Sequence, residues 1–242
     1  ERFSITETDT TGNVSAVVNR LVEVVSTQAI SGTQNGASAS VDYSGVTELT
    51  LSGDTVFNSW TTAKLPKKII AGSNKITFGA NSTVDLTGVT LDTLGNLDLY
   101  DNTVSITMSA NQATAFNAGT IDLSSNSGTS GAILVTASGD LTTQDLGSVT
   151  LTLSAAATLP DGTTDLPLSI NAASKAITIA STVDISGVTI TNAAALVISG
   201  SKNVTMAVAQ HSGGTAFSSI TASGSGQTIT LNDAGTVTAN AA

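Results

Sequence analysis

One stretch of this sequence occurs twice, and the repetition restricts which folds are possible. Residues 82–90, STVDLTGVT, return as STVDISGVT at residues 181–189. Each copy then runs to a Met followed four positions later by a Gln, and the chain contains no other Met. Further matches keep separations of 98 to 102 residues, and a shorter echo, VDYSGVT, stands at 41–47. A duplication of about 100 residues therefore organises the chain, and duplication adds length more readily than it builds an active site.

Inside each copy, short runs alternate an aliphatic residue with Thr, Ser or Asp. Examples are LTLSG at 49–53, VSITMS at 104–109 and VTLTLSA at 149–155. A period of two is typical of strands with one buried face. Gly, Asn and Ser separate the runs, so an all-β fold is predicted. The residues after each Met, SANQATAF and AVAQHSGGTAF, are expected to form a short helical turn.

Two all-β architectures fit this pattern, a β-solenoid (β-helix) and tandem β-sandwich domains. Sandwich cores normally contain several large aromatic residues, whereas this chain has one Trp, two Tyr and five Phe. Val, Ile, Leu and Ala must then fill the interior, which suits the narrow core of a solenoid, and we favour that fold. With ~20 residues per coil and strands ~4.8 Å apart, the chain would form a rod of about 50 Å.

The N-terminal segment has a different periodicity. Its apolar residues recur at i, i+3, i+4, i+7 and i+11: Val14, Val17, Val18, Leu21 and Val25. That spacing predicts an amphipathic helix, with Asn13 as N-cap and Gly32 near its end, although β-branched residues weaken it. Such a helix would cover the open end of the solenoid.

The expected organisation follows from these patterns. Residues 1–40 would contain an N-terminal strand and the capping helix. Residues 41–145 would form the first β-repeat unit and residues 146–242 the second.

Charge and composition exclude several functions. The net charge is −10 with only eight Lys and Arg, so neither a nucleic acid nor an anionic membrane surface is an expected partner. No apolar run is long enough for a transmembrane helix, so direct membrane insertion is not expected. Cys is absent, which leaves out disulfides and thiolate metal sites.

No catalytic constellation is recognisable, and an enzyme is not expected. The only His, His211, follows Gln210, whereas the other copy has Ala113 at that position. A polysaccharide-active β-helix would need carboxylates and cations together on one face, and cations are rare after Lys75. This function and ice binding by Thr ladders remain minor alternatives.

Four Asp residues stand between aliphatic neighbours, in VDL, LDL, IDL and VDI: Asp85, Asp98, Asp122 and Asp184. If the aliphatic side chains point inward, the carboxylates point outward. Stacked coils would then bring like charges close together, and Ca²⁺ would relieve the repulsion. A calcium site at these residues is one hypothesis. Solubilising the surface or hydrogen bonding at a corner is the other.

The segment 57–68, FNSWTTAKLPKK, contains the only Trp and the only basic cluster. If this segment forms an interaction surface, the residues expected to contact a partner are Trp60, Lys64, Lys67 and Lys68. Packing of the Trp against the side of the solenoid is the alternative.

Several phrases resemble very large repetitive bacterial surface proteins, which include type I-secreted adhesins and S-layer proteins. They are FSITETDTTGNVSAVVNRL, VTMAVAQ, VSITMSANQ and GQTITLNDAGTVTANAA. The resemblance implies export without a cleaved N-terminal signal, an extracellular location on the bacterial cell surface and frequent calcium dependence. The glycine-rich nonapeptide of calcium-binding repeats is missing here.

These observations together predict a structural segment of a secreted bacterial surface protein. Copies of this chain would associate with one another, or with copies of other surface proteins, to form a surface layer or filament. The alternative is the stalk or a ligand-binding module of a large adhesin.

Overall fold

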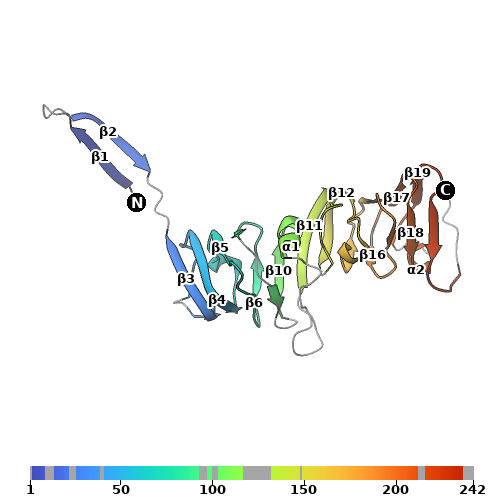
Figure 1. Ribbon diagram of the computed structural model, residues 1–242, viewed down its shortest axis with the longest axis horizontal. Coiled ribbons are helices and arrows are strands. Elements are labelled where there is room, and N and C mark those ends of the chain that lie inside the picture. The colour runs from blue at the N-terminus through green and yellow to red at the C-terminus, as the bar shows by residue number, and fades with distance from the viewer. Residues whose placement is uncertain are drawn as a thin grey trace.

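A computed structural model describes residues 2–8, 14–21, 26–38, 41–92, 97–99, 103–116, 132–147, 149–211 and 216–236. The chain forms a β-solenoid of about eight turns, in which parallel strands of successive turns stack along one axis (Figure 1). The predicted solenoid is therefore confirmed. Tandem β-sandwiches, whose sheets are antiparallel, do not fit this parallel stacking.

The first turns are built on two long strands, β3 (Thr27–Asn35) and β4 (Glu48–Asn58), which pair in parallel. The two halves of β4 carry separate short strands, β5 (Lys68–Ile70) and β6 (Ile76–Phe78). These in turn carry β8 (Thr90–Asp92) and β9 (Leu97–Leu99).

A second stack begins with β7 (Thr83–Asp85), on which β10 (Ser105–Met108) lies. β10 carries β11 (Ala132–Asp140), and β11 carries β12 (Thr150–Thr158). β12 divides as β4 does, with its two halves under β13 (Ser169–Asn171) and β14 (Ala176–Ile179).

The last turns continue these columns. β16 (Thr189–Thr191) lies on β13, and β17 (Ala195–Ser199) lies on β14 and carries β19 (Ile220–Ser223). A separate column contains β15 (Val183–Asp184), β18 (Asn203–Met206) and β20 (Thr228–Leu231).

Among the described residues, four short helical segments interrupt the strands: η1 (Thr62–Lys64), α1 (Ala110–Ala115), η3 (Thr163–Asp165) and α2 (Val208–His211). α1 and α2 follow the two Met residues, so the helical turns predicted there are confirmed. From β4 to α1 and again from β12 to α2 the elements come in the same order. That the two halves arose by duplication remains an inference from the sequence.

The core is a set of aliphatic columns along the axis. Leu49 lies in register with Ile69 and Leu151 with Ile170, and each of these four side chains is buried. Because successive residues alternate between the inside and the surface, Thr and Ser lie mostly on the outer face, although Thr55, Thr77 and Ser82 are buried. An aliphatic core of this kind needs few aromatic side chains. Those that the described core contains are concentrated in the first turns.

The prediction of an N-terminal helix is wrong. Val14–Leu21 is a strand, β2, which pairs antiparallel with β1 (Arg2–Thr8), and residues 22–25 and Asn13 lie outside the described residues. The spacing of apolar residues matches one helical face, but β-branched Val favours extended backbone. Pairing with β1 provides hydrogen-bond partners for the extended backbone of β2. Gly32 ends no helix. It lies within β3 at φ 70°, where the register to β4 shifts.

Candidate functional site

Two grooves open at equivalent corners of the solenoid. The first, of about 370 Å³, lies between η1 and the turn after β7; its wall includes Thr62, Leu65, Pro66, Asp85 and Gly88. The second, of about 390 Å³, lies between η3 and the turn after β15; its wall includes Thr163, Leu166, Pro167, Asp184 and Gly187. The repeated STVD[LI][TS]GVT phrase therefore forms one wall of a groove in each half.

The Asp of each phrase shapes the turn beside the groove. Asp85 Oδ1 accepts hydrogen bonds from the backbone N–H of Thr87 at 2.9 Å and from its hydroxyl at 2.6 Å. Asp184 Oδ1 accepts from the backbone N–H of Ser186 at 2.9 Å. A carboxylate that caps a turn two residues ahead is a common local use of Asp. Both copies of the phrase therefore form the same kind of Asp-capped turn.

A half-buried Gln holds the same turn from the next coil. Gln112 Nε2 donates to the carbonyls of Leu86 and Val89, at 2.8 and 3.0 Å. Its Oε1 accepts from the backbone N–H of Ser109, so the Gln bonds with three backbone groups. In the sequence this Gln stands out only as a position that matches between the two copies, because a bond to a backbone carbonyl leaves no partner residue type to recognise.

The grooves differ at one lip. Lys67 lines the first, and Leu168 lines the second with 54% of its surface exposed. The other lining residues of the first groove have counterparts of the same or similar type in the second, whose wall also includes Gly147 and Thr164. A ligand that used both grooves would therefore meet a cation in one and an apolar side chain in the other.

Trp60, proposed as a surface contact, is completely buried. Its ring stacks on Tyr43 at 5.4 Å between centroids and meets the edge of Phe57 at 4.7 Å. The alternative, packing of the Trp against the side of the solenoid, agrees in burying the ring, but the ring lies in the core itself. No side chain of a partner can reach it without unfolding the first turns.

The three lysines of the segment 57–68 make different contacts. Lys64 donates to the carbonyls of Gly36 and Ser38, which fastens the loop after β3. Lys68 lies between Glu48 at 3.6 Å and Asp92 at 3.1 Å, and its hydrogen bond to Asp92 raises its pKa. Lys67 is exposed at the lip of the first groove. Of the four candidates for interaction, Lys67 is thus the one that presents its side chain at a groove.

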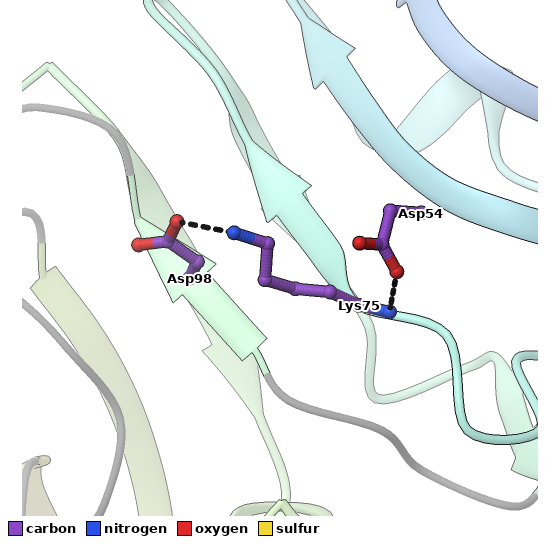
Figure 2. A network of polar contacts seen from close by, with 3 residues as sticks. All are labelled: Asp54, Lys75 and Asp98. Atoms are coloured by element: carbon purple, nitrogen blue, oxygen red, sulfur yellow. Dashed lines mark hydrogen bonds and ion pairs between the residues drawn. The ribbon is translucent and has the colours of Figure 1, made fainter.

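A second ionic contact links neighbouring coils (Figure 2). Lys75 Nζ lies 3.5 Å from Asp98 Oδ2, and the backbone N–H of Lys75 donates to Asp54 Oδ1 at 2.8 Å. The other oxygen of Asp98, Oδ1, is buried and has no hydrogen-bond partner among the described residues. Asp98 is therefore held by a cation of the protein itself.

The proposed aspartate ladder is not assembled by the described coils. Asp85 is in register with Thr107, Asp98 with Thr77 and Asp184 with Thr205. Asp122 lies outside the described residues. Within the described ranges, no three His, Cys, Asp or Glu side chains are placed to hold a metal ion together. Calcium binding stays a prediction from the sequence.

The fold and these grooves define the chain as a β-solenoid with a recurring corner site. No family model matches it, and neither a curated protein nor a solved structure shows significant similarity. In the part of the chain that the structure describes, no helix has the length and apolar character needed to cross a membrane.

Proposed function

We propose that this chain is a structural segment of a secreted bacterial surface protein, and that copies associate into a surface layer or filament. The observation that carries the proposal is the stacking of about eight parallel turns into one rod (Figure 1). Each turn contacts its neighbours in the stack, so length is added without changing the local packing. A rod of this kind is suited to spanning distance and to regular lateral contact.

The surface chemistry supports association. Residues 146–242 contain only six charged side chains: Asp161, Asp165, Lys175, Asp184, Lys202 and Asp233. The outer faces instead carry hydroxyl groups, as where Ser169 Oγ donates to Thr150 Oγ1 at 3.2 Å. Low charge reduces repulsion between copies, and flat hydroxyl-bearing faces can exchange hydrogen bonds with water for hydrogen bonds with a neighbour.

The test is the size distribution of the purified chain by light scattering and negative-stain imaging. We expect sheets or filaments that grow with protein concentration. The measurement is repeated in millimolar calcium and then in chelator, and assemblies that dissolve on chelation would support the calcium hypothesis. A monodisperse rod at every concentration would exclude a self-assembling layer.

The twin grooves favour a second candidate, a stalk or ligand-binding module of an adhesin. Their volumes, about 370 and 390 Å³, fall in the range of small-ligand sites. An added Cβ at Gly88 or Gly187 meets nothing within 4 Å, so Gly88→Tyr and Gly187→Tyr would fill the grooves without disturbing the core. Binding of the monomeric rod to glycans or cells should then fall. Gly45→Tyr, also in open space, is the control.

A further inference from the structure

The two grooves share a polar wall made of a hydroxyl and a carboxylate. In the first groove, the hydroxyl of Thr62 accepts a hydrogen bond from the backbone N–H of Asp85 at 2.9 Å, and in the second Thr163 accepts from that of Asp184 at 3.2 Å. Each Thr hydroxyl therefore keeps its own proton to donate. Both aspartates accept their turn hydrogen bonds through Oδ1, and their Oδ2 atoms make no hydrogen bond within the described residues. Each groove thus offers a donor and a charged acceptor close together.

The rest of each wall is largely aliphatic. Three residues at matching positions contribute to it: Leu65, Pro66 and Val89 in the first groove, and Leu166, Pro167 and Val188 in the second. None of the described lining residues is aromatic, so a ligand held by ring stacking is not expected. A strongly anionic ligand would meet an aspartate in either groove and a net charge of −10 on the chain. A sugar fits both kinds of wall, because its hydroxyl groups bind the carboxylate and its C–H groups contact the aliphatic side chains.

The lip of each groove carries one residue at a matching backbone position. The N–H of Lys67 donates to the carbonyl of Val46 at 3.1 Å, and the N–H of Leu168 donates to that of Val149 at 3.0 Å. Because the backbone is held in the same way, the two side chains start from the same place relative to the walls. The first groove therefore combines a cation with its carboxylate, whereas Asp184 is the one charged residue in the described lining of the second.

The grooves lie at opposite edges of one parallel sheet. The column of β7 and β10 continues through β11 into the first half of β12, and from there into β13 and β16. The first groove follows β7, where the chain leaves this sheet. The second precedes β13 and β16, where the chain enters it. A straight ligand aligned with the axis of the rod cannot occupy both grooves, so each groove is a separate site.

We propose that the two grooves are separate carbohydrate sites. In each, the aspartate accepts hydrogen bonds from sugar hydroxyl groups, and the aliphatic wall contacts the sugar ring. A neutral sugar binds in both grooves. An acidic sugar prefers the first, because the charge of Lys67 offsets that of Asp85, whereas Asp184 alone repels a second carboxylate. This inference rests on the second candidate function, the ligand-binding module, and specifies its ligand and residues.

An NMR titration of the isotope-labelled monomeric rod tests the two sites separately, because Gly88 lines one groove and Gly187 the other. With methyl glucoside, we expect the backbone amide signals of both glycines to shift and to saturate. With glucuronate, we expect the signal of Gly88 to saturate at a concentration about two- to fivefold lower than that of Gly187, as for an exposed charge pair. Signals that shift elsewhere and not at these glycines would overturn the proposal.

Exchange of the lip residues tests the specificity. Lys67→Leu should remove the preference of glucuronate for the first groove, and Leu168→Lys should give the second groove the affinity of the first. Binding of methyl glucoside should change little in either variant. Lys175→Leu removes a cation at an exposed position outside both linings and should leave the preference as it was. A preference that survives both lip exchanges would overturn the role of Lys67.

The carboxylate is tested in one groove at a time. Asp85→Asn keeps an oxygen that can accept the turn hydrogen bonds but removes the charge. We expect the affinity of methyl glucoside to fall several-fold at Gly88 and to stay unchanged at Gly187, since hydrogen bonds to charged groups are stronger than neutral ones. The unchanged second groove shows that the variant is folded. Equal affinity at Gly88 before and after the substitution would overturn the role of Asp85.

The outcomes separate this inference from the proposed function. Binding to glycans or cells that persists in the Gly88→Tyr, Gly187→Tyr double variant would leave the adhesin module standing and overturn the grooves as its sites. A rod that binds cells, but neither sugar at either glycine, would do the same. A rod that binds no sugar, glycan or cell would overturn both.

Discussion

Gln112 and Gln210, 98 residues apart, make the same hydrogen bonds in the two halves of the solenoid. Gln210 Nε2 donates to the carbonyls of Ile185 and Val188 at 2.7 and 2.8 Å, and its Oε1 accepts from the N–H of Ala207 at 2.8 Å. Each Gln thus joins the start of a short helix to the turn of the coil before it. The pair accounts for why a Gln recurs after each Met.

Removing one of these amides should destabilise the protein more than its size suggests. Gln210→Ala leaves the carbonyls of Ile185 and Val188 without their donor in a buried site, which should cost about 1 to 3 kcal/mol of unfolding free energy. Denaturant unfolding measures the change. Gln28→Ala, at an exposed position on β3, should cost far less. Equal losses of unfolding free energy in the two variants would show that the hydrogen bonds of Gln210 contribute nothing to stability.

The single Trp reports on the core. Because Trp60 is fully buried, its emission should be blue-shifted relative to the unfolded chain and poorly quenched by iodide. Trp60→Ala should lower the unfolding free energy by about 3 to 5 kcal/mol, as for other large core truncations. Leu168→Ala, on the surface, should change it little. Strong quenching of the native protein would contradict the buried position.

Two glycines offer a matched comparison. A Cβ on Gly36 would lie 2.6 Å from the backbone oxygen of Ser59, so Gly36→Ala forces the first two turns apart. We expect a loss of about 1 to 3 kcal/mol, typical of overpacking. Gly45→Ala meets nothing within 4 Å and should be nearly neutral. Thermal unfolding of the two variants distinguishes them, and a tolerant Gly36 would mean that the coils separate easily.

Turn-capping carboxylates should make stability fall in acid. Backbone hydrogen bonds from Ser44 and Thr142 lower the pKa of Asp42 and Asp140 below the ordinary 3.8. Each carboxylate therefore stabilises the folded chain above that pH, and the contribution is lost as the pH falls through the lowered pKa. Asn at both positions keeps an acceptor that does not titrate.

The measurement is the unfolding temperature of the unmodified chain and of the Asp42→Asn, Asp140→Asn double variant, from neutral pH to about pH 2.5. The advantage of the unmodified chain over the variant should shrink towards acid pH. A difference that stays constant with pH would refute a role for these two charges.

The solenoid was predictable because its determinants are local and repeated. Alternation in runs such as residues 49–53 specifies strands, and the scarcity of aromatic rings points to a narrow core. Of the aromatic rings in the described core, Tyr43, Phe57, Trp60 and Phe78 are gathered in the first turns, whereas Phe116 and Phe217 lie further along the chain. That grouping explains why Trp60 could be misread as a surface contact: its partners are brought together only by the stacking of coils.

The errors have physical causes. Val14, Val17 and Val18 fit one face of a helix by spacing, but the same residues pair with β1 as an extended strand, and pairing is invisible to periodicity. The aspartates were expected to face one another across coils. In the structure the three that are described, Asp85, Asp98 and Asp184, each lie in register with a Thr of a neighbouring coil, because successive coils are not copies of one another.

The direction of the ladder bonds has a mechanical consequence. In a solenoid the hydrogen bonds between strands run along the axis. A force that pulls the two ends apart therefore acts on the hydrogen bonds of every turn, one turn after another along the axis. Force then opens the terminal turn first, and each turn that yields releases ~20 residues, or about 70 Å of extended chain. A chain built in this way responds to pulling by lengthening in small steps, and the remaining turns keep their shape.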